Sequence, residues 1–402
     1  MSEAQAANDP ESGTGPGEQG GDPRRQEDWP EPAGPLAGMP MHSTVEGAAW
    51  PVFPDRAGEA MLAMMWQFER TERMAPNRLR AFQLAQAGSV VRHAARHVGF
   101  YRDLWRSRGL EPLNGPLTQK RFEALPVITH AVLQQGGDAA FSAVVPEGHG
   151  AIRAAETATS SGRRLGIRTT DLTQFMWRAF TLRDHLWHRR DLTGKLAAIR
   201  RLPLARVRES NWGLATAALC ATGPAVGLDI DHPLDAQAQW LIDENPDSLI
   251  TYPGNLHALA DWFVAHGLRL PGLKDIRTVS GVVSAGQRAA CSRAFGLPLV
   301  DSYSTRALGY LALQCPLHEH YHVQSEGALV ELLDDDGRPV VPGASGRVVV
   351  TSLHNFAMPF IRYDTGDFAT AGAPCDCGRS LPVLAQIDGR ARKGTPVPLG
   401  QT

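Results

Sequence analysis

From about residue 151, short apolar runs alternate with segments that have the length and composition of helices. The apolar runs lie at 196–199, 248–252, 276–283 and 297–300, and the helical segments include 255–266 and 286–295. Strands that alternate with helices form βαβ units, and the strands of such units run parallel. The pattern predicts an α/β core over residues 151–320 that contains a largely parallel sheet.

The region before this core has a different periodicity. Between residues 60 and 109, apolar side chains recur at intervals of three to four, which is the spacing of one face of a helix. We therefore expect a mainly helical N-terminal layer over 46–150. Residues 1–45 are rich in Gly, Pro, Glu, Asp and Gln, and so polar a segment is expected to be a disordered tail.

The sequence pattern after the core predicts closely spaced strands. Runs at 327–333 and 346–352 are separated by a turn at 334–338 that carries the Asp-Gly signal of a hairpin. These features predict a small antiparallel β subdomain over 321–393. Residues 394–402 would then be the start of a hinge.

Composition excludes several classes of protein. The 402 residues include 40 Lys plus Arg and 42 Asp plus Glu, so a net charge of -2 gives no strong field to attract nucleic acid or an anionic membrane. No segment approaches the roughly 20 apolar residues of a bilayer span or has the apolar run of a signal peptide. Five cysteines do not suggest a secreted disulfide framework. We expect a cytoplasmic protein.

Several motifs follow one another in a fixed order along the chain. They are Val98-Gly99-Phe100-Tyr101-Arg102, the segment 157–165, Tyr252-Pro253, Asp301-Ser302-Tyr303, the segment 359–367 that reads PFIRYDTGD, and Ile387-Asp388-Gly389-Arg390. In this order and spacing they resemble adenylate-forming enzymes of the phenylacetate-CoA ligase and capsule-biosynthesis adenylyltransferase type. The resemblance covers roughly residues 60–393 and implies the adenylate-forming N-terminal domain as the fold.

The resemblance also implies a chemistry. Members of that family activate a carboxylate with ATP and Mg²⁺, form an acyl-adenylate and pyrophosphate, and often pass the acyl group to coenzyme A. It assigns Asp367 to the ribose hydroxyls and the ring of Tyr303, preceded by Asp301 and Ser302, to adenine. A turn cap is the alternative for Asp367, and a core tyrosine is the alternative for Tyr303.

The phosphate loop implied by the resemblance comprises Thr159, Ser160, Ser161 and Gly162. Hydroxyls and close backbone N–H groups are what such loops offer to phosphate, although a Ser/Thr-rich turn is more often only a loop. Arg306 and Arg362 are the candidate catalytic side chains, because a guanidinium can neutralise phosphate oxygens.

The chain departs from the family pattern at several positions. Ala307 stands where relatives carry the Glu that binds Mg²⁺, so Arg306 beside it would offer a cation to phosphate instead. Val282 replaces a second acidic residue, and Thr159 replaces a glycine. Relatives continue beyond the hinge, near Lys393 here, into a mobile lid domain of about 100 residues, a normal size for an independent unit. We expect that domain to be absent from the sequence considered.

Four residues have the chemistry of a structural zinc site, and the resemblance implies such a site, since some relatives carry a structural zinc at matching positions. Thiolates and an imidazole are donors that zinc favours, and four protein ligands leave no open position for a substrate. The candidates are Cys315, His322, Cys375 and Cys377. Free or partly buried cysteines are the alternative. A basic run between Arg183 and Arg208 would either meet coenzyme A phosphates or form a solvated face.

Two hypotheses follow from the sequence. The first is an enzyme that activates a small carboxylic acid and passes it to coenzyme A or a carrier protein. The second is a catalytically impaired relative that acts as a binding or scaffolding partner, or that needs a lid protein supplied as a separate chain. A monomer and a homodimer are both compatible with the sequence.

Overall fold

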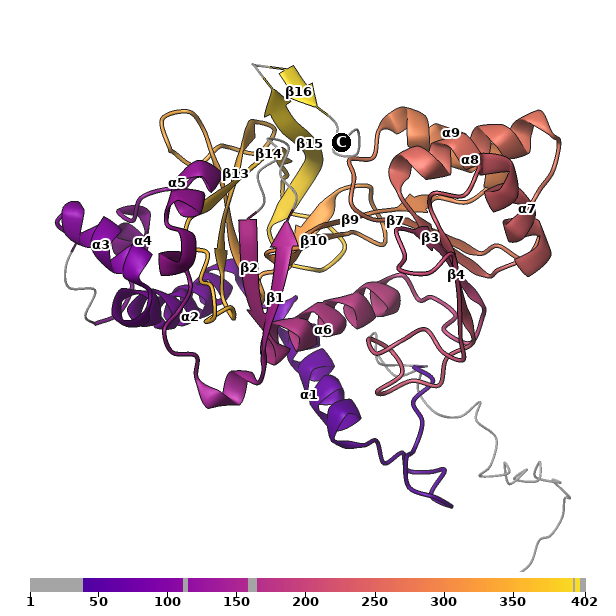
Figure 1. Cartoon of the computed structure of the whole chain (residues 1–402), viewed down its shortest axis with the longest axis horizontal. Helices are drawn as coiled ribbons and strands as arrows, with labels where there is room; N and C mark the ends of the chain where they lie inside the picture. Colours follow the sequence, from indigo (N-terminus) through magenta and orange to yellow (C-terminus); the bar gives the residue numbers. More distant parts are fainter. Residues whose placement is uncertain (1–38, 111–114, 158–164, 393–394, 398–402) are drawn as a thin grey trace, which may run out of the picture.

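The computed structural model describes residues 39–110, 115–157, 165–392 and 395–397, and Figure 1 shows their arrangement. The helices are α1 (Arg56–Thr71), α2 (Pro76–His97), α3 (Gly99–Ser107), α4 (Gln119–Glu123), α5 (His130–Gln135), α6 (Asp171–Trp187), α7 (Leu234–Glu244), α8 (Pro253–Ala265) and α9 (Ala285–Phe295), with short 3₁₀ turns at Gly137–Ala140 and Glu147–His149. Helices α1 to α5 confirm that the N-terminal part is mainly helical.

The strands form three sheets. They are β1 (Ile152–Thr157), β2 (Leu165–Thr170), β3 (Leu196–Arg200), β4 (Arg206–Glu209), β5 (Ala225–Asp229), β6 (Ser248–Thr251), β7 (Asp275–Thr278), β8 (Leu299–Val300), β9 (Ser302–Thr305), β10 (Gly309–Gln314), β11 (Tyr321–Val323), β12 (Ala328–Leu333), β13 (Ser345–Ser352), β14 (Tyr363–Ala371), β15 (Val383–Arg392) and β16 (Thr395–Val397). Strands β1 and β2 form a separate antiparallel hairpin.

The predicted parallel sheet is present, with strand order β4-β5-β3-β6-β7-β8. All its neighbouring pairs are parallel except β4–β5, which is antiparallel. Helices α7, α8 and α9 lie together against this sheet (Figure 1), and their apolar faces share one core with its strands. Ser284 begins α9 with a capping box and Gly296, at φ 70°, ends it, which matches the helix expected at 286–295.

The antiparallel sheet is larger than the sequence predicts. Its order is β12-β13-β14-β15-β11-β10-β9, with β16 paired to β15. The expected β12–β13 hairpin is present, with Leu333 opposite Arg347. The sheet begins at Ser302 and not near residue 321, because β9 and β10 pair antiparallel within it. The fold class is therefore confirmed, while the boundary at 320–321 divides a continuous sheet.

Helix α6 lies between the two large sheets in the view of Figure 1. Its N-terminus is fixed by a capping box in which the hydroxyl of Thr170 accepts from the Thr173 backbone and the Thr173 hydroxyl accepts from the Thr170 backbone. Its apolar side chains share a core with α1, β10 and the segment after residue 39. Within the described part of the chain, no helix combines the length and apolar character that crossing a membrane requires.

Candidate functional site

The two residues predicted to hold the nucleoside contact each other directly. The hydroxyl of Tyr303 on β9 donates to Oδ2 of Asp367 on β14 at 2.6 Å. Three strands separate β9 from β14 in the sheet order, so the sheet curves enough to bring them together. Both side chains are buried, with 5% of Tyr303 and 2% of Asp367 exposed. The predicted convergence is present, but without a gap of nucleoside size between these two groups.

A cation completes this cluster. Arg390 lies opposite Asp367 on β15, and its Nε donates to Oδ1 of Asp367 at 3.2 Å. Both carboxylate oxygens are therefore engaged. Burial raises the pKa of Asp367, and the hydrogen bonds from Tyr303 and Arg390 oppose that rise. Burial, followed by the charge of Asp367, raises the pKa of Tyr303 well above its ordinary value. A ribose hydroxyl would have to replace the Tyr303 or the Arg390 contact.

The turn before Asp367 has its own support. The carboxylate of Asp364 accepts from the backbone of Gly366 at 2.9 Å, and the hydroxyl of Thr365 accepts from the backbone of Asp367 at 3.1 Å. Gly366 adopts φ 76°, which favours glycine. Asp364 and Thr365 thus hold the turn, and the Asp367 side chain is left to face Tyr303 and Arg390.

The surroundings of Arg362 do not support the catalytic role predicted for it. Its Nε and Nη2 donate to the two carboxylate oxygens of Glu331 at 3.1 and 3.0 Å, and its Nη1 donates to the carbonyls of Glu123 and Leu125 at 2.6 Å each. Arg362 is only 5% exposed. All three guanidinium nitrogens of Arg362 thus form hydrogen bonds that join β12 to the end of α4 and the residues after it. These contacts support a structural role for Arg362.

Asp301 is also surrounded by protein groups. The hydroxyls of Thr278 and Tyr321 donate to its two oxygens at 2.8 and 2.9 Å. Burial raises its pKa from 3.8 to about 6, although these hydrogen bonds favour the ionised form. The neighbouring Ser302 is buried at the start of β9. Among the described residues, neither the Asp301 side chain nor the Ser302 side chain forms a hydrogen bond with Tyr303 or Asp367.

Replacing Asp301 with Asn is expected to flatten part of the pH dependence of stability. A carboxyl with a raised folded pKa stabilises the fold below its unfolded pKa, near 3.8, and that contribution is lost as pH rises through about 6. About two pKa units correspond to roughly 3 kcal/mol. Urea unfolding between pH 4 and 8 measures the effect, with Asp335→Asn as the exposed control. Parallel curves for the wild type and Asp301→Asn would contradict the prediction.

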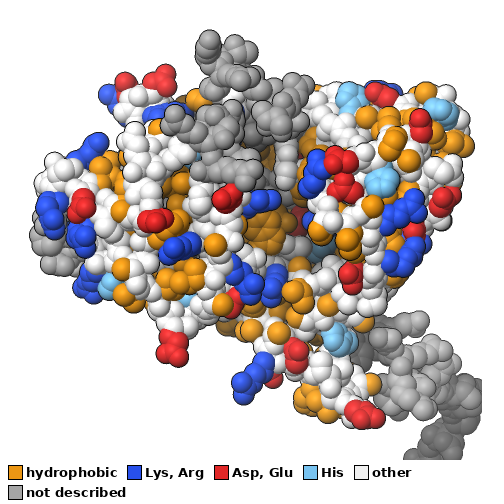
Figure 2. Space-filling model, viewed as in Figure 1, with side chains coloured by type: hydrophobic (Ala, Val, Ile, Leu, Met, Phe, Trp, Pro, Cys, Tyr) orange, Lys and Arg blue, Asp and Glu red, His pale blue; other side chains and the backbone are white. Residues whose placement is uncertain are grey.

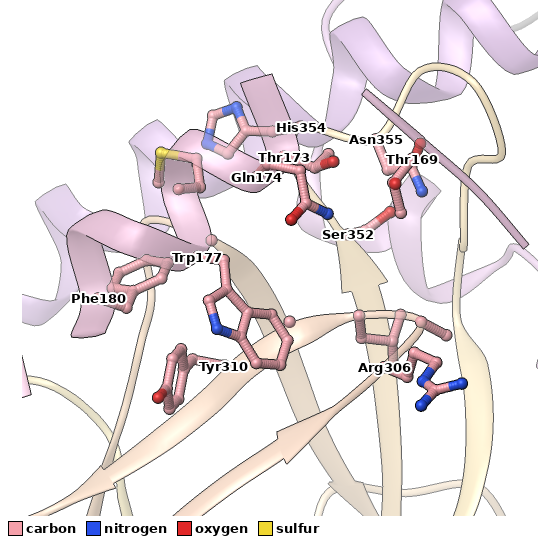
Figure 3. A pocket seen from close by; sticks show the side chains of 15 residues that line it. Thr169, Thr173, Gln174, Trp177, Phe180, Arg306, Tyr310, Ser352, His354 and Asn355 are labelled. Carbon is pink, nitrogen blue, oxygen red and sulfur yellow. The ribbon is translucent and has the colours of Figure 1, made fainter. Parts of the chain in front are cut away.

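A cavity opens between α6, β2, the β9–β10 turn and the segment after β13. Leu308 of its lining packs against the core that contains Tyr303. Figure 3 shows it from close by, with Trp177 and Tyr310 on one side and Gln174 and Ser352 on the other. Its volume is about 50 Å³, and it opens to solvent. Its lining comprises Thr169, Thr173, Gln174, Met176, Trp177, Phe180, Arg306, Ala307, Leu308, Gly309, Tyr310, Gly327, Ser352, His354 and Asn355.

The predicted residue Arg306 lies at this cavity. Its Nη1 donates to the carbonyl of Glu156, at the end of β1, at 3.0 Å. The predicted phosphate-loop residues (Thr159, Ser160, Ser161 and Gly162) lie outside the described residues, between β1 and β2. Ala307 packs against the core that contains α2 and β14, and Val282 packs against the core that contains Tyr303. The two positions at which the sequence resemblance implies an acidic residue thus serve apolar packing in this chain.

Sequence reasoning did not identify the α6 side of this cavity. Gln174 and Trp177 come from the first two turns of α6, and Tyr310 comes from β10. The signal available was the capping sequence from Thr170 to Thr173, which predicts a helix start after residue 170. The figure shows the amide of Gln174 projecting into the space above Trp177.

The four predicted metal ligands lie together. Cys315 directly follows β10, His322 lies on β11, and Cys375 and Cys377 lie between β14 and β15. Their ligand atoms are all within 4.8 Å of one another. The Sγ atoms of Cys315 and Cys375 are 3.9 Å apart, and Sγ of Cys377 is 3.3 Å from Nε2 of His322. A tetrahedral zinc ion with bonds of about 2.3 Å to sulfur places neighbouring ligands about 3.7 Å apart, so the quartet fits zinc.

The protonation of two ligands also suits a metal. Burial lowers the pKa of His322 to about 4, so its imidazole is neutral near pH 7. Burial alone would raise the pKa of Cys377, but hydrogen bonds from the Arg379 backbone, Cys375 and the Arg379 side chain outweigh it and lower that pKa. A neutral imidazole and an easily formed thiolate are the forms that bind zinc.

Comparisons with known proteins agree with this fold and these motifs. No family model matches the chain. Phenylacetate-coenzyme A ligase of Thermus thermophilus is 25% identical over 342 residues, which cover 81% of this chain and 73% of that protein. The chain is a phenylacetate-CoA ligase homologue.

Solved structures show the same fold for this phenylacetate-CoA ligase homologue. A 2-hydroxyisobutyryl-CoA ligase in the postadenylation state, in complex with R3-HIB-AMP, superposes with a TM-score of 0.63 at 22% identity, over 81% of this chain and 71% of that one. The structure of that ligase with 2-HIB-AMP and CoA, in the thioesterification state, gives a TM-score of 0.65 at 21% identity, over 81% and 70%. The homologue therefore has the adenylate-forming fold.

The basic run of the homologue is largely committed to ion pairs. Arg190 is buried and donates to Asp184 and Asp275 at 2.6 and 2.9 Å. Lys195 and Arg208 both pair with Glu244. Arg190, Lys195 and Arg208 therefore have acidic partners within the protein. Neither the prediction of a solvated face nor that of cations free for coenzyme A phosphates describes these three residues.

Proposed function

We propose that this phenylacetate-CoA ligase homologue activates a small carboxylic acid with ATP to form an acyl-adenylate, with coenzyme A as the acyl acceptor. The observation that carries the proposal is the hydrogen bond of Tyr303 to Asp367, which joins the two candidate nucleoside residues at one point of the antiparallel sheet. Leu308, which lines the cavity with Arg306, packs against the core that contains Tyr303. The related ligase structures hold an acyl-AMP and CoA, and the curated relative is named for its coenzyme A ligation.

Each residue has a specific task in this proposal. Asp367 exchanges its contact with Arg390 or Tyr303 for the ribose hydroxyls, which a carboxylate accepts well. The ring of Tyr303 offers a flat apolar face to the purine. Arg306 meets phosphate oxygens from the cavity side, while its contact with the Glu156 carbonyl holds the guanidinium in place. Figure 2 shows that the surface is hollowed between the two sheets, with hydrophobic side chains on the floor of the hollow.

Asp367→Asn is expected to weaken ATP binding at least about 10-fold, because an amide cannot offer two charged acceptors to ribose. Acid-dependent exchange of pyrophosphate into ATP, measured across a panel of small carboxylic acids, should fall by a similar or larger factor. Asp388→Asn is the matched control, since Asp388 lies on the neighbouring strand and bonds Ser345 and Thr370. Unchanged binding in Asp367→Asn, or no exchange by the wild type with any acid, would contradict the proposal.

A second candidate function has its own support. Ala307 and Val282 are apolar, and both oxygens of Asp367 are occupied by protein groups. These features favour a relative that binds a ligand or a protein partner without turnover. ATP binding without exchange would select this second function, whereas acid-dependent exchange would select the first.

We also propose that Cys315, His322, Cys375 and Cys377 hold a structural zinc ion. Bound zinc would close the four donors into one rigid unit and would take no part in the reaction, since no ligand position remains open. The residues around it support a structural task. Arg379 stacks on Trp187 with its guanidinium 4.3 Å from the ring centre, and Trp187 donates to Glu72, the buried C-cap residue of α1, at 2.8 Å.

A further inference from the structure

The cavity beside the β9–β10 turn has an unusual charge for a site that would take a metal nucleotide. Its lining, among the residues that the structure describes, contains no aspartate and no glutamate. Arg306 supplies a positive charge, and burial lowers the pKa of His354, whose Nε2 bonds the carbonyl of Glu326 at 2.8 Å. His354 is therefore neutral near pH 7. Near pH 7, Arg306 is therefore the one charged side chain in the described lining.

Magnesium requires a different environment. It is a hard cation that binds through carboxylates, waters and phosphate oxygens in octahedral geometry. Here the position next to Arg306 is Ala307, which packs into the core and offers no ligand atom. A divalent cation near Arg306 would also meet a like charge. Arg306 donates to the backbone carbonyl of Glu156.

The groups still available in the cavity suit an anion. The side chains of Thr173, Ser352 and Asn355 already bond the backbone around them. Neither Thr169 nor Gln174 has a recorded side-chain hydrogen bond within the described part of the chain, and Gln174 points into the cavity in Figure 3. A guanidinium, an amide and a hydroxyl together offer several donors to the oxygens of one anion.

We propose that this chain binds the phosphate tail of ATP without Mg²⁺, with the Arg306 guanidinium in the place of the metal. The proposal rests on the proposed nucleotide function and specifies its ligand as free ATP, not the magnesium complex. Arg306 meets the β- and γ-phosphates in this arrangement, while AMP, which lacks them, is held without its help. Magnesium would compete with Arg306 for the same oxygens.

Calorimetric titration of the full chain with ATP and with AMP, each in EDTA and in excess MgCl₂, tests the proposal. ATP should bind in EDTA at least as tightly as in MgCl₂. Arg306→Gln should weaken ATP binding in EDTA at least about 10-fold, because a charged hydrogen-bonding group is lost, and change AMP binding less than about twofold. Arg306→Lys, which keeps the charge, should recover part of the ATP affinity.

Ala307→Glu provides the reverse test. A carboxylate at this position adds a magnesium ligand and an opposite charge beside Arg306, so ATP binding should become dependent on MgCl₂. Thermal unfolding of every variant verifies that it is folded. If the wild-type protein binds AMP but binds ATP only in MgCl₂, the magnesium-free proposal is wrong and nucleotide binding stands. In that case, loss of the MgCl₂ dependence in Glu156→Gln would identify Glu156 as the metal ligand. If neither nucleotide binds, the proposed function fails as well.

Discussion

Cys377→Ser is expected to lower the thermal unfolding midpoint of this protein by about 10 °C or more and to abolish stoichiometric zinc binding. Serine does not supply the thiolate that zinc binds, and Cys315, Cys375 and His322 would remain gathered without the ion that joins them. Structural zinc contributes roughly 10–16 kcal/mol in small zinc-dependent domains. Losing about 8 kcal/mol of this would shift the midpoint of a chain of this length by about the stated amount.

The location of the quartet explains why so large an effect is expected. Its ligands come from the residue after β10, from β11 and from the segment between β14 and β15, so the ion would cross-link parts of the chain 62 residues apart, from 315 to 377. The ring of His322 also packs edge-on against Trp187 of α6, with 5.8 Å between ring centres. Loss of the ion should therefore loosen α6 as well as the sheet.

Metal analysis and differential scanning calorimetry measure both parts of this prediction. Cys291→Ser is the matched control, because Cys291 is a buried thiol on α9 that lies outside the quartet. It should keep the zinc content while lowering the midpoint less. Equal zinc content in Cys377→Ser and the wild type would show that the quartet does not hold the metal. An unchanged midpoint in a zinc-free variant would show that the metal is not structural.

Local signals allowed much of the fold to be predicted from the sequence. The β12–β13 hairpin follows from Asp336 and Gly337, because Gly337 adopts φ 77° at the turn. The helix expected at 255–266 is α8, which starts two residues earlier because Pro253 suits the first helical turn. The predicted boundary between the α/β core and the β subdomain, at 320–321, was less accurate. A buried apolar strand such as β10 has the same sequence pattern whether its neighbours run parallel or antiparallel.

Long-range pairing limited the prediction of the site. The motif order placed Tyr303 and Asp367 in one site, but it did not indicate that the tyrosine hydroxyl would bond the carboxylate. Arg362 occurs inside the most specific motif of the chain, yet its partner Glu331 lies 31 residues away on another strand. A guanidinium is equally suited to phosphate and to a buried carboxylate, so only the tertiary structure decides between the two.

The same ambiguity applies to Arg183, where the structure predicts a large effect on stability. Arg183→Met is expected to destabilise the protein by about 3–5 kcal/mol, because it leaves the carboxylate of Glu326 buried without its counter-charge. Nη2 of Arg183 donates to Glu326 at 2.7 Å and to the carbonyl of Phe68 at 3.0 Å, and its guanidinium lies 3.9 Å from the ring centre of Phe68. Arg183 is 2% exposed.

The double variant Arg183→Met with Glu326→Gln distinguishes an unpaired charge from lost packing. Burial raises the pKa of Glu326, but the charge and hydrogen bonds of Arg183, together with a hydrogen bond from the Thr71 hydroxyl, outweigh burial and lower it, so Arg183 supplies the counter-charge of this carboxylate. Removing both charges should recover much of the loss. Arg338→Met breaks an exposed pair with Asp336 and should have no measurable effect. If the double variant is no more stable in urea than Arg183→Met, then the cost comes from the lost contacts of Arg183 with Phe68 and Gln324 and not from an unpaired charge.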